Sequence, residues 1–475
     1  MIKNNKDKVL LITSSFEDVP LTPAARTDED SHYPIGLAYL HSYIESKNID
    51  VRTICLNNKP YEYCFKKVIE IIENFSPNII GFQMLTSNRV SSYRLIEYIH
   101  KNYPKIKIIS GGIHSTIMYK QLIEKYPFLI AVLGEGEITF FELIKELDKK
   151  NPNLKKIDGI AFYKNKNVVR TKPRKLIENL DTLPFPKHEL FFKNNKRYSG
   201  CLLTSRGCPF SCSFCCLNPE AKRIVRFRSP KNVVDEIEYM VKNFPQITEV
   251  FIHDDSFFID NERVIKICDE IIKRKIKINF VCSGRVKPIS KEMIKKLEQA
   301  NFKRVIIGVE SGDNGILKAC HKGINQEDIL SAFKLFSKSS INLKTFLIVG
   351  LPGENIKTIK ETSRFIKKLQ KIKYASYGNF SNFLIVYPGT EVYEIAKSKG
   401  MLNDEFWLSD KEIPLFTAEN SYEELNKLGD ILLNNIAFAR IITPKGFKAQ
   451  FKMIPYIFVY FLTKIGETIK AGRLA

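Results

Sequence analysis

Residues 205–216, Ser205-Arg206-Gly207-Cys208-Pro209-Phe210-Ser211-Cys212-Ser213-Phe214-Cys215-Cys216, decide how the rest of this 475-residue sequence is interpreted. Cys208, Cys212 and Cys215 stand at C-x3-C-x2-C spacing, with Phe214 before the third cysteine. Glycine, proline and serine favour a loop here over a strand or helix, and a loop lets three thiolates converge on one centre. Because a [4Fe–4S] cluster normally takes four cysteines, three would leave one iron open for another ligand.

Two other interpretations of these cysteines are weaker. A structural zinc site usually combines two Cys/His pairs, whereas no second pair stands nearby and Cys216 directly follows Cys215. A disulfide framework does not suit a long, lysine-rich chain in which we recognise no secretion signal. The spacing therefore favours an iron–sulfur site over zinc.

The C-x3-C-x-Φ-C pattern resembles the signature of the radical S-adenosylmethionine (SAM) superfamily. The resemblance implies a [4Fe–4S] cluster held by Cys208, Cys212 and Cys215, with Phe214 beside the cofactor. It also implies that the open iron binds the amino and carboxylate groups of SAM, whose reductive cleavage gives a 5′-deoxyadenosyl radical.

Bulk composition limits the function and the compartment. The formal charge of +22 would suit nucleic acid or an anionic membrane, but the lysines are spread along the whole chain. Since a patch and not a total marks a binding surface, we expect solvated lysine-rich faces and no nucleic-acid partner. Ten cysteines and no apolar run of about 18 residues favour a reducing cytoplasm and no membrane-spanning helix.

Residues 1–150 alternate short apolar runs with amphipathic segments. This alternation predicts a doubly wound, Rossmann-like α/β domain, whose ligand would bind at the carboxyl ends of the strands. No G-x-G-x-x-G follows the first strand, so a dinucleotide is not favoured. We expect strands at 8–14, 51–56, 78–83, 106–111 and 129–133, and helices at 36–47, 63–74, 90–103, 119–126 and 138–149.

This half resembles the cobalamin-binding domain that precedes many radical SAM domains. The matching pieces are YPIGLAYL at 33–40, GGIHST at 111–116 and LGEGE at 133–137. Cobalt ligation by His32 remains an alternative to an open lower face, because Asp30-Ser31-His32 approaches the D-x-H-x-x-G motif but Gly36 stands one residue too far. The resemblance implies cobalamin contacts from Thr86, Ser87, Gly111, Gly112, His114, Ser115, Thr116, Gly134 and Glu135.

Residues 151–198 look like a linker, and residues 199–400 resume the strand–helix alternation. The linker contains a hairpin signal at 160–171 and the proline-rich segment 184–186. Six strand–helix units then predict a partial (β/α)6 barrel of the TIM type, two units short of eight. Its strands are expected at 200–205, 249–253, 279–283, 304–309, 344–349 and 379–386.

Polar or glycine-rich residues follow these strands in the order found in radical SAM enzymes. By that resemblance, Asp254 and Asp255 would receive the SAM amino group, and Ser283 and Arg285 would lie near its carboxylate. Glu310 would contact the ribose, and Gly350 with Pro352 would lie beside the adenine. Each acidic residue alone is as well explained by a helix cap, so the register of the whole set supports the assignment.

Residues 401–475 are predicted to be mostly helical. Segments 422–433 and 435–442 look amphipathic, and 453–462 is an apolar run flanked by lysines. That run is too short to span a bilayer. A helix lying in a membrane interface and a tail helix packed on protein are equally compatible with it.

The expected function is that of a cobalamin-dependent radical SAM enzyme, most simply a methyltransferase acting on a carbon or phosphorus centre. An oxidative cyclase or carbon–carbon bond-forming enzyme with the same cofactors is the alternative. A tRNA methylthiotransferase is disfavoured because only Cys55 and Cys64 precede residue 200, and the SAM positions argue against a corrinoid or iron–sulfur sensor. We expect a small-molecule or lipid substrate, flavodoxin or ferredoxin as reductant, and a cytoplasmic enzyme, with membrane association through the tail as a variant.

Overall fold

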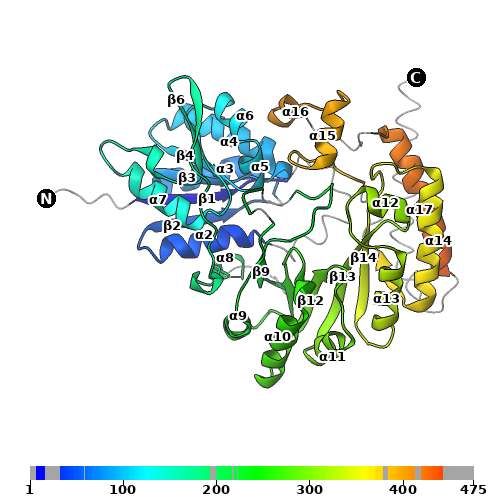
Figure 1. Cartoon of the computed structure of the whole chain (residues 1–475). Helices are drawn as coiled ribbons and strands as arrows, with labels where there is room; N and C mark the ends of the chain where they lie inside the picture. Colours follow the sequence, from blue (N-terminus) through cyan, green and yellow to red (C-terminus); the bar gives the residue numbers. More distant parts are fainter. Residues whose placement is uncertain are drawn as a thin grey trace.

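The computed structural model describes residues 7–16, 33–57, 59–192, 199–216, 219–221, 223–377, 383–411 and 419–441. Two α/β bodies lie side by side, one built from the blue and cyan part of the chain and the other from the green and yellow part (Figure 1). The expected fold class, a Rossmann-like domain followed by a partial barrel and helices, is confirmed.

The first body contains a seven-stranded sheet in the order β2-β1-β3-β4-β5-β6-β7. The first five strands are parallel, and the apolar run at the centre of β1 is completely buried because helices cover both faces of the sheet. Their bounds are β1 Lys8–Thr13, β2 Asp50–Cys55, β3 Ile79–Gln83, β4 Lys107–Gly111 and β5 Ile130–Val132. The helices are α2 Ile35–Glu45, α3 Tyr61–Phe75, α4 Arg89–Asn102, α5 Ile113–Ile117, α6 Tyr119–Lys125 and α7 Glu137–Leu147.

The hairpin expected inside the linker continues this first sheet. Strands β6 (Ile160–Lys164) and β7 (Asn167–Arg170) pair antiparallel, and β6 also pairs antiparallel with β5. The two turn residues, Asn165 and Lys166, have φ of 52° and 62°, the left-handed pair that a two-residue hairpin turn requires. The first sheet therefore extends to Arg170.

The second body contains six parallel strands in the order β15-β14-β13-β12-β11-β8. They are β8 Ser199–Leu202, β11 Glu249–Ile252, β12 Asn279–Gly284, β13 Phe302–Glu310, β14 Asn342–Leu347 and β15 Ala375–Tyr377. The intervening helices are α9 Pro230–Asn243, α10 Asn261–Lys273, α11 Lys291–Gln299, α12 Asn314–Ala319, α13 Gln326–Phe336 and α14 Ile356–Ile372. A short ribbon of β9 (Ser205–Arg206) and β10 (Arg226–Phe227) flanks the cysteine loop.

The sixth strand is the one part of the barrel that was predicted wrongly. The structure places it at β15, directly after α14, whereas we expected it at 379–386; residues 379–382 of that range lie outside the described residues. Phe383 forms only an isolated bridge with Val349. Leu384 and Val386 pack into the core of the first body, and this explains why that apolar run resembled a buried strand.

The chain after the barrel returns to the first body. Helices α15 (Glu391–Ser398) and α16 (Asp404–Leu408) lie beside α4 and α6 at the top of Figure 1. Trp407 is completely buried there, and its carbonyl accepts a hydrogen bond from the Tyr93 hydroxyl at 3.0 Å. Helix α17 (Tyr422–Ile441) then packs against α14. The two bodies thus share one continuous hydrophobic cluster.

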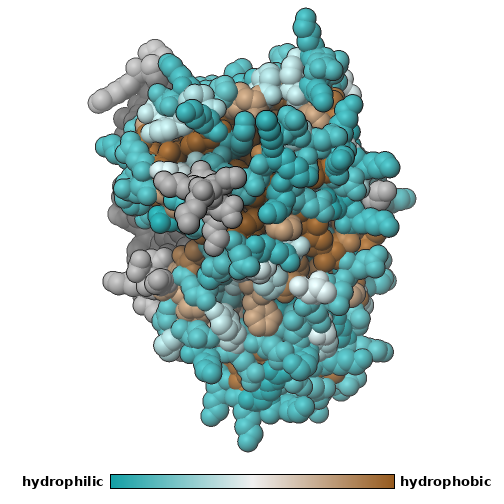
Figure 2. Space-filling model, turned by 90° about the vertical axis from the view of Figure 1, so that its left-hand side faces the viewer, coloured by the Kyte–Doolittle hydropathy of each residue, from teal (hydrophilic) through white to brown (hydrophobic). Residues whose placement is uncertain are grey.

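The surface of the first body is mainly hydrophilic, with apolar side chains gathered in recesses (Figure 2). None of the helices in the described part of the chain has the length and apolar character needed to cross a membrane. The apolar run at 453–462, for which we expected a tail helix or an interfacial one, lies outside the described residues.

Candidate active site between the two domains

The cysteine loop begins directly after β9. Gly207 has φ 95°, and a Cβ atom on it would lie 2.2 Å from the carbonyl oxygen of Ile224, so only glycine fits. The loop is tied on both sides: the Ser213 amide donates to the carbonyl of Cys320 at 3.0 Å, and the Ser213 carbonyl accepts from Val392 at 3.2 Å. These bonds hold the cysteines between the barrel and the returning segment.

The three motif thiols fit a cluster better than a single ion. Burial raises the pKa of Cys215 to about 12, and the Cys212 and Cys208 sulfurs add to the rise because they lie nearby. Among the described residues, no three His, Cys, Asp or Glu side chains converge on a point suited to one metal ion. A [4Fe–4S] cube does not need such a point, because each cysteine ligates a different iron.

Arg285 presents an incompletely satisfied guanidinium beside this loop. It is 6% exposed, its Nη1 donates to the Cys212 sulfur at 3.4 Å, and its plane lies 3.8 Å from the centre of the Phe210 ring. Its Nε and Nη2 have no hydrogen-bond partner among the described residues. A buried cation with unused donors is costly unless an anion completes it, so this site fits the carboxylate expected there.

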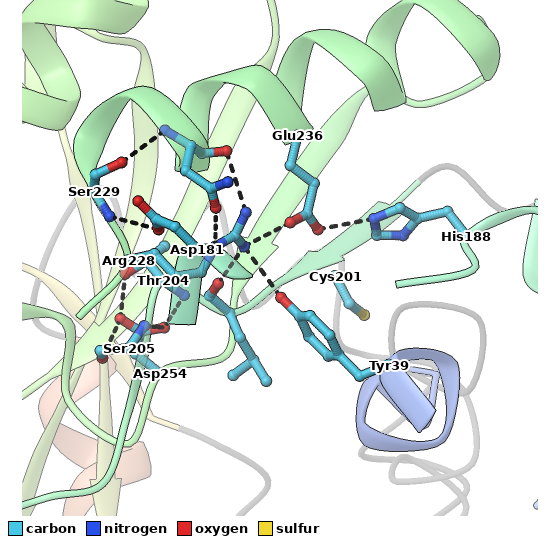
Figure 3. A network of polar contacts seen from close by, with 12 residues as sticks. Tyr39, Asp181, His188, Cys201, Thr204, Ser205, Arg228, Ser229, Glu236 and Asp254 are labelled. Carbon is cyan, nitrogen blue, oxygen red and sulfur yellow. Dashed lines mark hydrogen bonds and ion pairs between the residues drawn. The ribbon is translucent and has the colours of Figure 1, made fainter. Parts of the chain in front are cut away.

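Of the two aspartates after β11, the structure turns only one toward the cavity. Asp254 is 3% exposed, and both carboxylate oxygens accept hydrogen bonds from the amides and hydroxyls of Thr204 and Ser205 (Figure 3). This corrects the expectation that Asp254 receives an amino group, because its acceptor sites are used to fix the end of β8. Asp255 lines the cavity and accepts the Gly207 amide at 3.1 Å, and Ser283 donates to the Asp254 carbonyl at 3.5 Å.

Glu310 is held by a partner that was not found from the sequence. The Lys322 ammonium lies 2.7 Å from its carboxylate, with both side chains under 10% exposed. Glu310 has φ 63°, and its side chain folds over Gly308, where a Cβ atom would collide with both charged groups. Lys322 also lies 5.9 Å from the ring of Phe214. Lys322 lies between α12 and α13 and belongs to no sequence motif, so the sequence alone did not indicate it.

The glycine–proline turn after β14 adopts the expected tight form. Gly350 has φ 94°, and its amide donates to the Glu354 carboxylate at 2.5 Å. Pro352 is partly exposed in this turn. Burial raises the pKa of Glu354 to about 8, and its second carboxylate oxygen has no hydrogen-bond partner among the described residues.

A cavity of about 450 Å³ joins the cysteine loop to the strand ends of the first sheet. Its lining is largely apolar, and we call this apolar part of the cavity the slot. Gly81 is tightly packed there, since a Cβ atom on it would lie 2.9 Å from Leu11 and 3.1 Å from Phe140, which also line the cavity. An apolar slot rimmed by glycines fits part of a large ring system such as a corrin. The first body lines it with Gly36, Leu37, Gln83, Ser110, Gly111, Gly112, Gly134 and Glu135 among others, and the second with Ser205, Arg206, Gly207, Cys208, Cys216, His253 and Asp255 among others.

Only part of the predicted cobalamin set lines this cavity. Gly111, Gly112, Gly134 and Glu135 do, whereas Thr86, Ser87, Ser115 and Thr116 do not. Two further residues line the cavity but were not predicted to contact cobalamin: Gln83, the last residue of β3, and Ser110, the second-last residue of β4. Neither belongs to a sequence motif.

His114 does not form the cavity wall that we expected. It is completely buried, and its two ring nitrogens contact the Thr86 hydroxyl at 3.1 Å and the Tyr93 hydroxyl at 2.7 Å. Burial lowers its pKa to about 3, so it stays neutral and structural. His32 lies outside the described residues.

Comparisons with known proteins agree with this arrangement. A family model described as the radical SAM superfamily matches residues 202–366, and one described as a B12 binding domain matches residues 22–144. The chain is 30% identical over 379 residues to an uncharacterized methyltransferase of Pyrococcus horikoshii, covering 79% of this chain and 80% of that one. It is 28% identical over 347 residues to the anaerobic magnesium-protoporphyrin IX monomethyl ester cyclase of Rubrivivax gelatinosus, covering 70% and 62%.

Two solved structures have the same fold over most of this chain. The methyltransferase TsrM of Kitasatospora setae, with cobalamin and a [4Fe–4S] cluster bound, superposes with a TM-score of 0.66 at 19% identity, covering 83% of this chain and 78% of that one. OxsB, with aqua-cobalamin and SAM bound, has a TM-score of 0.66 at 22% identity, covering 90% and 61%. At these identities the likeness shows the fold.

Proposed function

This chain belongs to the radical SAM enzymes that carry a B12-binding domain, and from that premise we propose that it transfers a methyl group to a carbon or phosphorus centre of a small molecule. The observation that carries the proposal is the single cavity lined both by Cys208 and by the strand ends of the first sheet. A group held at the strand ends would face the cysteine loop with no wall between them.

The cofactors that we infer are a [4Fe–4S] cluster, SAM and cobalamin. When bound, they supply one-electron cleavage of SAM to a 5′-deoxyadenosyl radical and a transferable methyl group. Cys208, Cys212 and Cys215 would hold the cluster, and the glycine-rimmed slot would hold part of the corrin.

The remaining site residues bind and orient. The unused Arg285 donors would bind the SAM carboxylate, and Asp255, the aspartate that lines the cavity, would accept its amino group. Glu310, oriented by Lys322, would accept a ribose hydroxyl, and the Gly350 turn would lie against the adenine. The apolar cavity lining excludes water from the reacting groups.

The proposed radical chemistry also bears on the electron donor, the cellular compartment and the substrate. We infer flavodoxin or ferredoxin as the electron donor, because the cluster must be reduced one electron at a time. All ten cysteines are free thiols, in keeping with a reducing cytoplasm. A lipid substrate with membrane contact through the tail stays a variant of the proposal.

An oxidative cyclisation is the second candidate, and it is favoured by the likeness to the magnesium-protoporphyrin ester cyclase. The two can be separated without the substrate, by anaerobic reconstitution with hydroxocobalamin, reductant and SAM carrying a deuterated methyl group. A methyltransferase should place the label on the corrinoid and release S-adenosylhomocysteine. Retained corrinoid that never becomes labelled, while 5′-deoxyadenosine accumulates, would contradict methyl transfer and favour the cyclase.

A further inference from the structure

Four charged side chains bridge the two domains at the rim of the cavity. Glu135 accepts hydrogen bonds from Arg206 at 3.0 Å and from both terminal nitrogens of Arg226 at 2.9 Å. Glu137 accepts from the other terminal nitrogen of Arg206 at 2.6 Å. We call these residues the Glu–Arg clamp. Its carboxylates come from the turn before α7 (Glu135) and from the first residue of that helix (Glu137), and its guanidiniums come from the β9–β10 ribbon beside the cysteine loop.

The clamp is a neutral unit in which most charged atoms are paired, whereas the Arg226 Nε has no hydrogen-bond partner among the described residues. Its four side chains are 7–17% exposed, and two positive charges balance two negative ones. The amide of Ile177 fills a further acceptor position of Glu135 at 3.1 Å. The structure therefore adds a role to the one expected for Glu135: its carboxylate holds the neighbouring domain while the residue also lines the cavity.

No flexible segment separates the clamp from the cluster ligands. Arg206 stands between Ser205 and Gly207, whose amides are bound by Asp254 and Asp255 respectively. Gly207 is itself locked against the Ile224 carbonyl. A shift of the Arg206 backbone would therefore be transmitted to Cys208, two residues further along the chain.

We propose that the Glu–Arg clamp is a positioning element that fixes the separation between the cobalamin held at the strand ends and the cluster held by the cysteine loop. Glu135 lines the cavity beside Gly134 and Gly136, and Arg206 lines it beside Cys208, so the clamp borders both of the proposed cofactor sites. This inference rests on the proposed function. The clamp acts through the backbone of the cysteine loop and does not touch the reacting atoms.

A second polar network also holds the domains together, and it meets the clamp where the Arg206 guanidinium lies 5.1 Å from the centre of the Tyr39 ring. In Figure 3, Tyr39 of α2 and His188 reach toward Arg228 and Glu236 of the barrel. The Arg228 guanidinium contacts the Tyr39 hydroxyl at 3.1 Å and Glu236 at 2.5 Å, and His188 lies 2.9 Å from Glu236. With these buried contacts intact, loss of one clamp residue should loosen the cavity wall without separating the domains.

The test uses the full-length protein loaded anaerobically with a [4Fe–4S] cluster and hydroxocobalamin, then reduced with dithionite. The microwave power that half-saturates the cob(II)alamin resonance measures its magnetic interaction with the cluster. In the variants Glu137→Gln and Arg206→Gln, the half-saturation power should fall severalfold relative to wild type. The reason is that the cluster speeds the relaxation of cob(II)alamin less when the distance between them increases. Arg206→Lys should behave likewise, since one ammonium cannot bridge two carboxylates in the way a guanidinium does.

Stability separates positioning from a purely structural role. The double variant Glu137→Gln, Arg206→Gln removes both charges, so its melting temperature should exceed that of the less stable single variant while its half-saturation power stays low. Arg274→Gln is the matched control: Arg274 also binds several carboxylates, from α9 and α10, and it does not line the cavity. It should leave the resonance unchanged.

Two outcomes would overturn the inference in different ways. Clamp variants that bind both cofactors and saturate like wild type would refute the clamp alone. A wild-type protein that binds no corrinoid or no cluster would refute the proposed function, and the clamp inference with it.

Discussion

At the scale of single residues, Arg285 is the group whose surroundings most clearly require a ligand. Its charge is buried, and two of its donor nitrogens are unused among the described residues. We predict that Arg285→Lys weakens SAM binding by about 10- to 100-fold, the equivalent of losing one charge-assisted bidentate contact. Calorimetric titration of SAM into the cluster-loaded protein measures this. The exposed Arg304, replaced by lysine, serves as the control, and equal affinities for the two variants would contradict the assignment.

The Glu310–Lys322 pair should behave as one unit. Lys322→Met leaves a buried carboxylate without its partner, and we expect it to lower the free energy of unfolding by about 3–5 kcal/mol. The double variant Glu310→Gln, Lys322→Met removes both charges and should recover most of that loss. Urea denaturation of the four proteins in the cycle gives the coupling energy, and strictly additive effects would show that the pair is not coupled.

Residue chemistry was predictable from the sequence wherever a motif fixed it. The cysteine spacing, Arg285 and Glu310 were assigned in this way, and the structure places Arg285 against Cys212 of the loop and pairs Glu310 with Lys322. The sequence could not show that the Asp254 carboxylate accepts hydrogen bonds from Thr204 and Ser205. Hydrogen-bond partners that lie far apart in the chain leave no local sequence pattern. Lys322 was missed for the same reason.

At the scale of elements, Gly81 of β3 decides whether the slot in the first sheet stays open. Gly81→Ala places a methyl group against Leu11 and Phe140 and should push those side chains into the slot. We expect corrinoid retention to fall at least about tenfold while the cluster still forms. Gly200→Ala in β8, where the new methyl group meets Met240 at 3.1 Å, is the matched control. Normal corrinoid content in Gly81→Ala, measured by absorbance after desalting, would place the ligand elsewhere.

The turn that leads into α14 should make stability depend on pH. Burial raises the pKa of Glu354 from its usual 4.5 to about 8. Between these values the unfolded chain releases the proton and the folded chain keeps it, so the free energy of unfolding falls as pH rises, by up to about 5 kcal/mol.

Glu354→Gln should remove this dependence, because glutamine is neutral at every pH and keeps the oxygen that accepts the Gly350 amide. Its stability relative to wild type should therefore rise from about pH 5 to about pH 8. Urea titrations at both pH values provide the comparison. A difference between the two proteins that stays constant with pH would mean that Glu354 ionises normally.

Most strands could be predicted because a buried parallel strand appears in the sequence as a short run of apolar residues. All five strands of the first Rossmann-like unit fall where expected. The prediction failed at β15, a three-residue strand that is too short to show a pattern. It also failed at residues 384–386, which are apolar because they pack into the core of the other domain. Packing between distant segments decided both cases.

At the scale of the whole molecule, the two domains are joined on three sides. The Glu–Arg clamp lies at the cavity, the Arg228–Glu236–His188 network lies below α2, and the returning segment buries Trp407 against α4. The domain order was predictable from the resemblance of each half. The joins were not, because each depends on residues more than 40 positions apart. A rigid junction suits a site built from both domains.

The measurement that tests the central claim most directly is the anaerobic formation of 5′-deoxyadenosine from SAM by the reconstituted protein. We expect the wild-type chain to form it in the presence of reductant, and the variant Cys208→Ala, Cys212→Ala, Cys215→Ala to form none while remaining folded. The neighbouring Cys216→Ala, which lies outside the motif, should retain activity. A triple variant that still cleaves SAM, or a cluster-loaded wild type that does not, would contradict the assignment of this loop as the radical-generating centre.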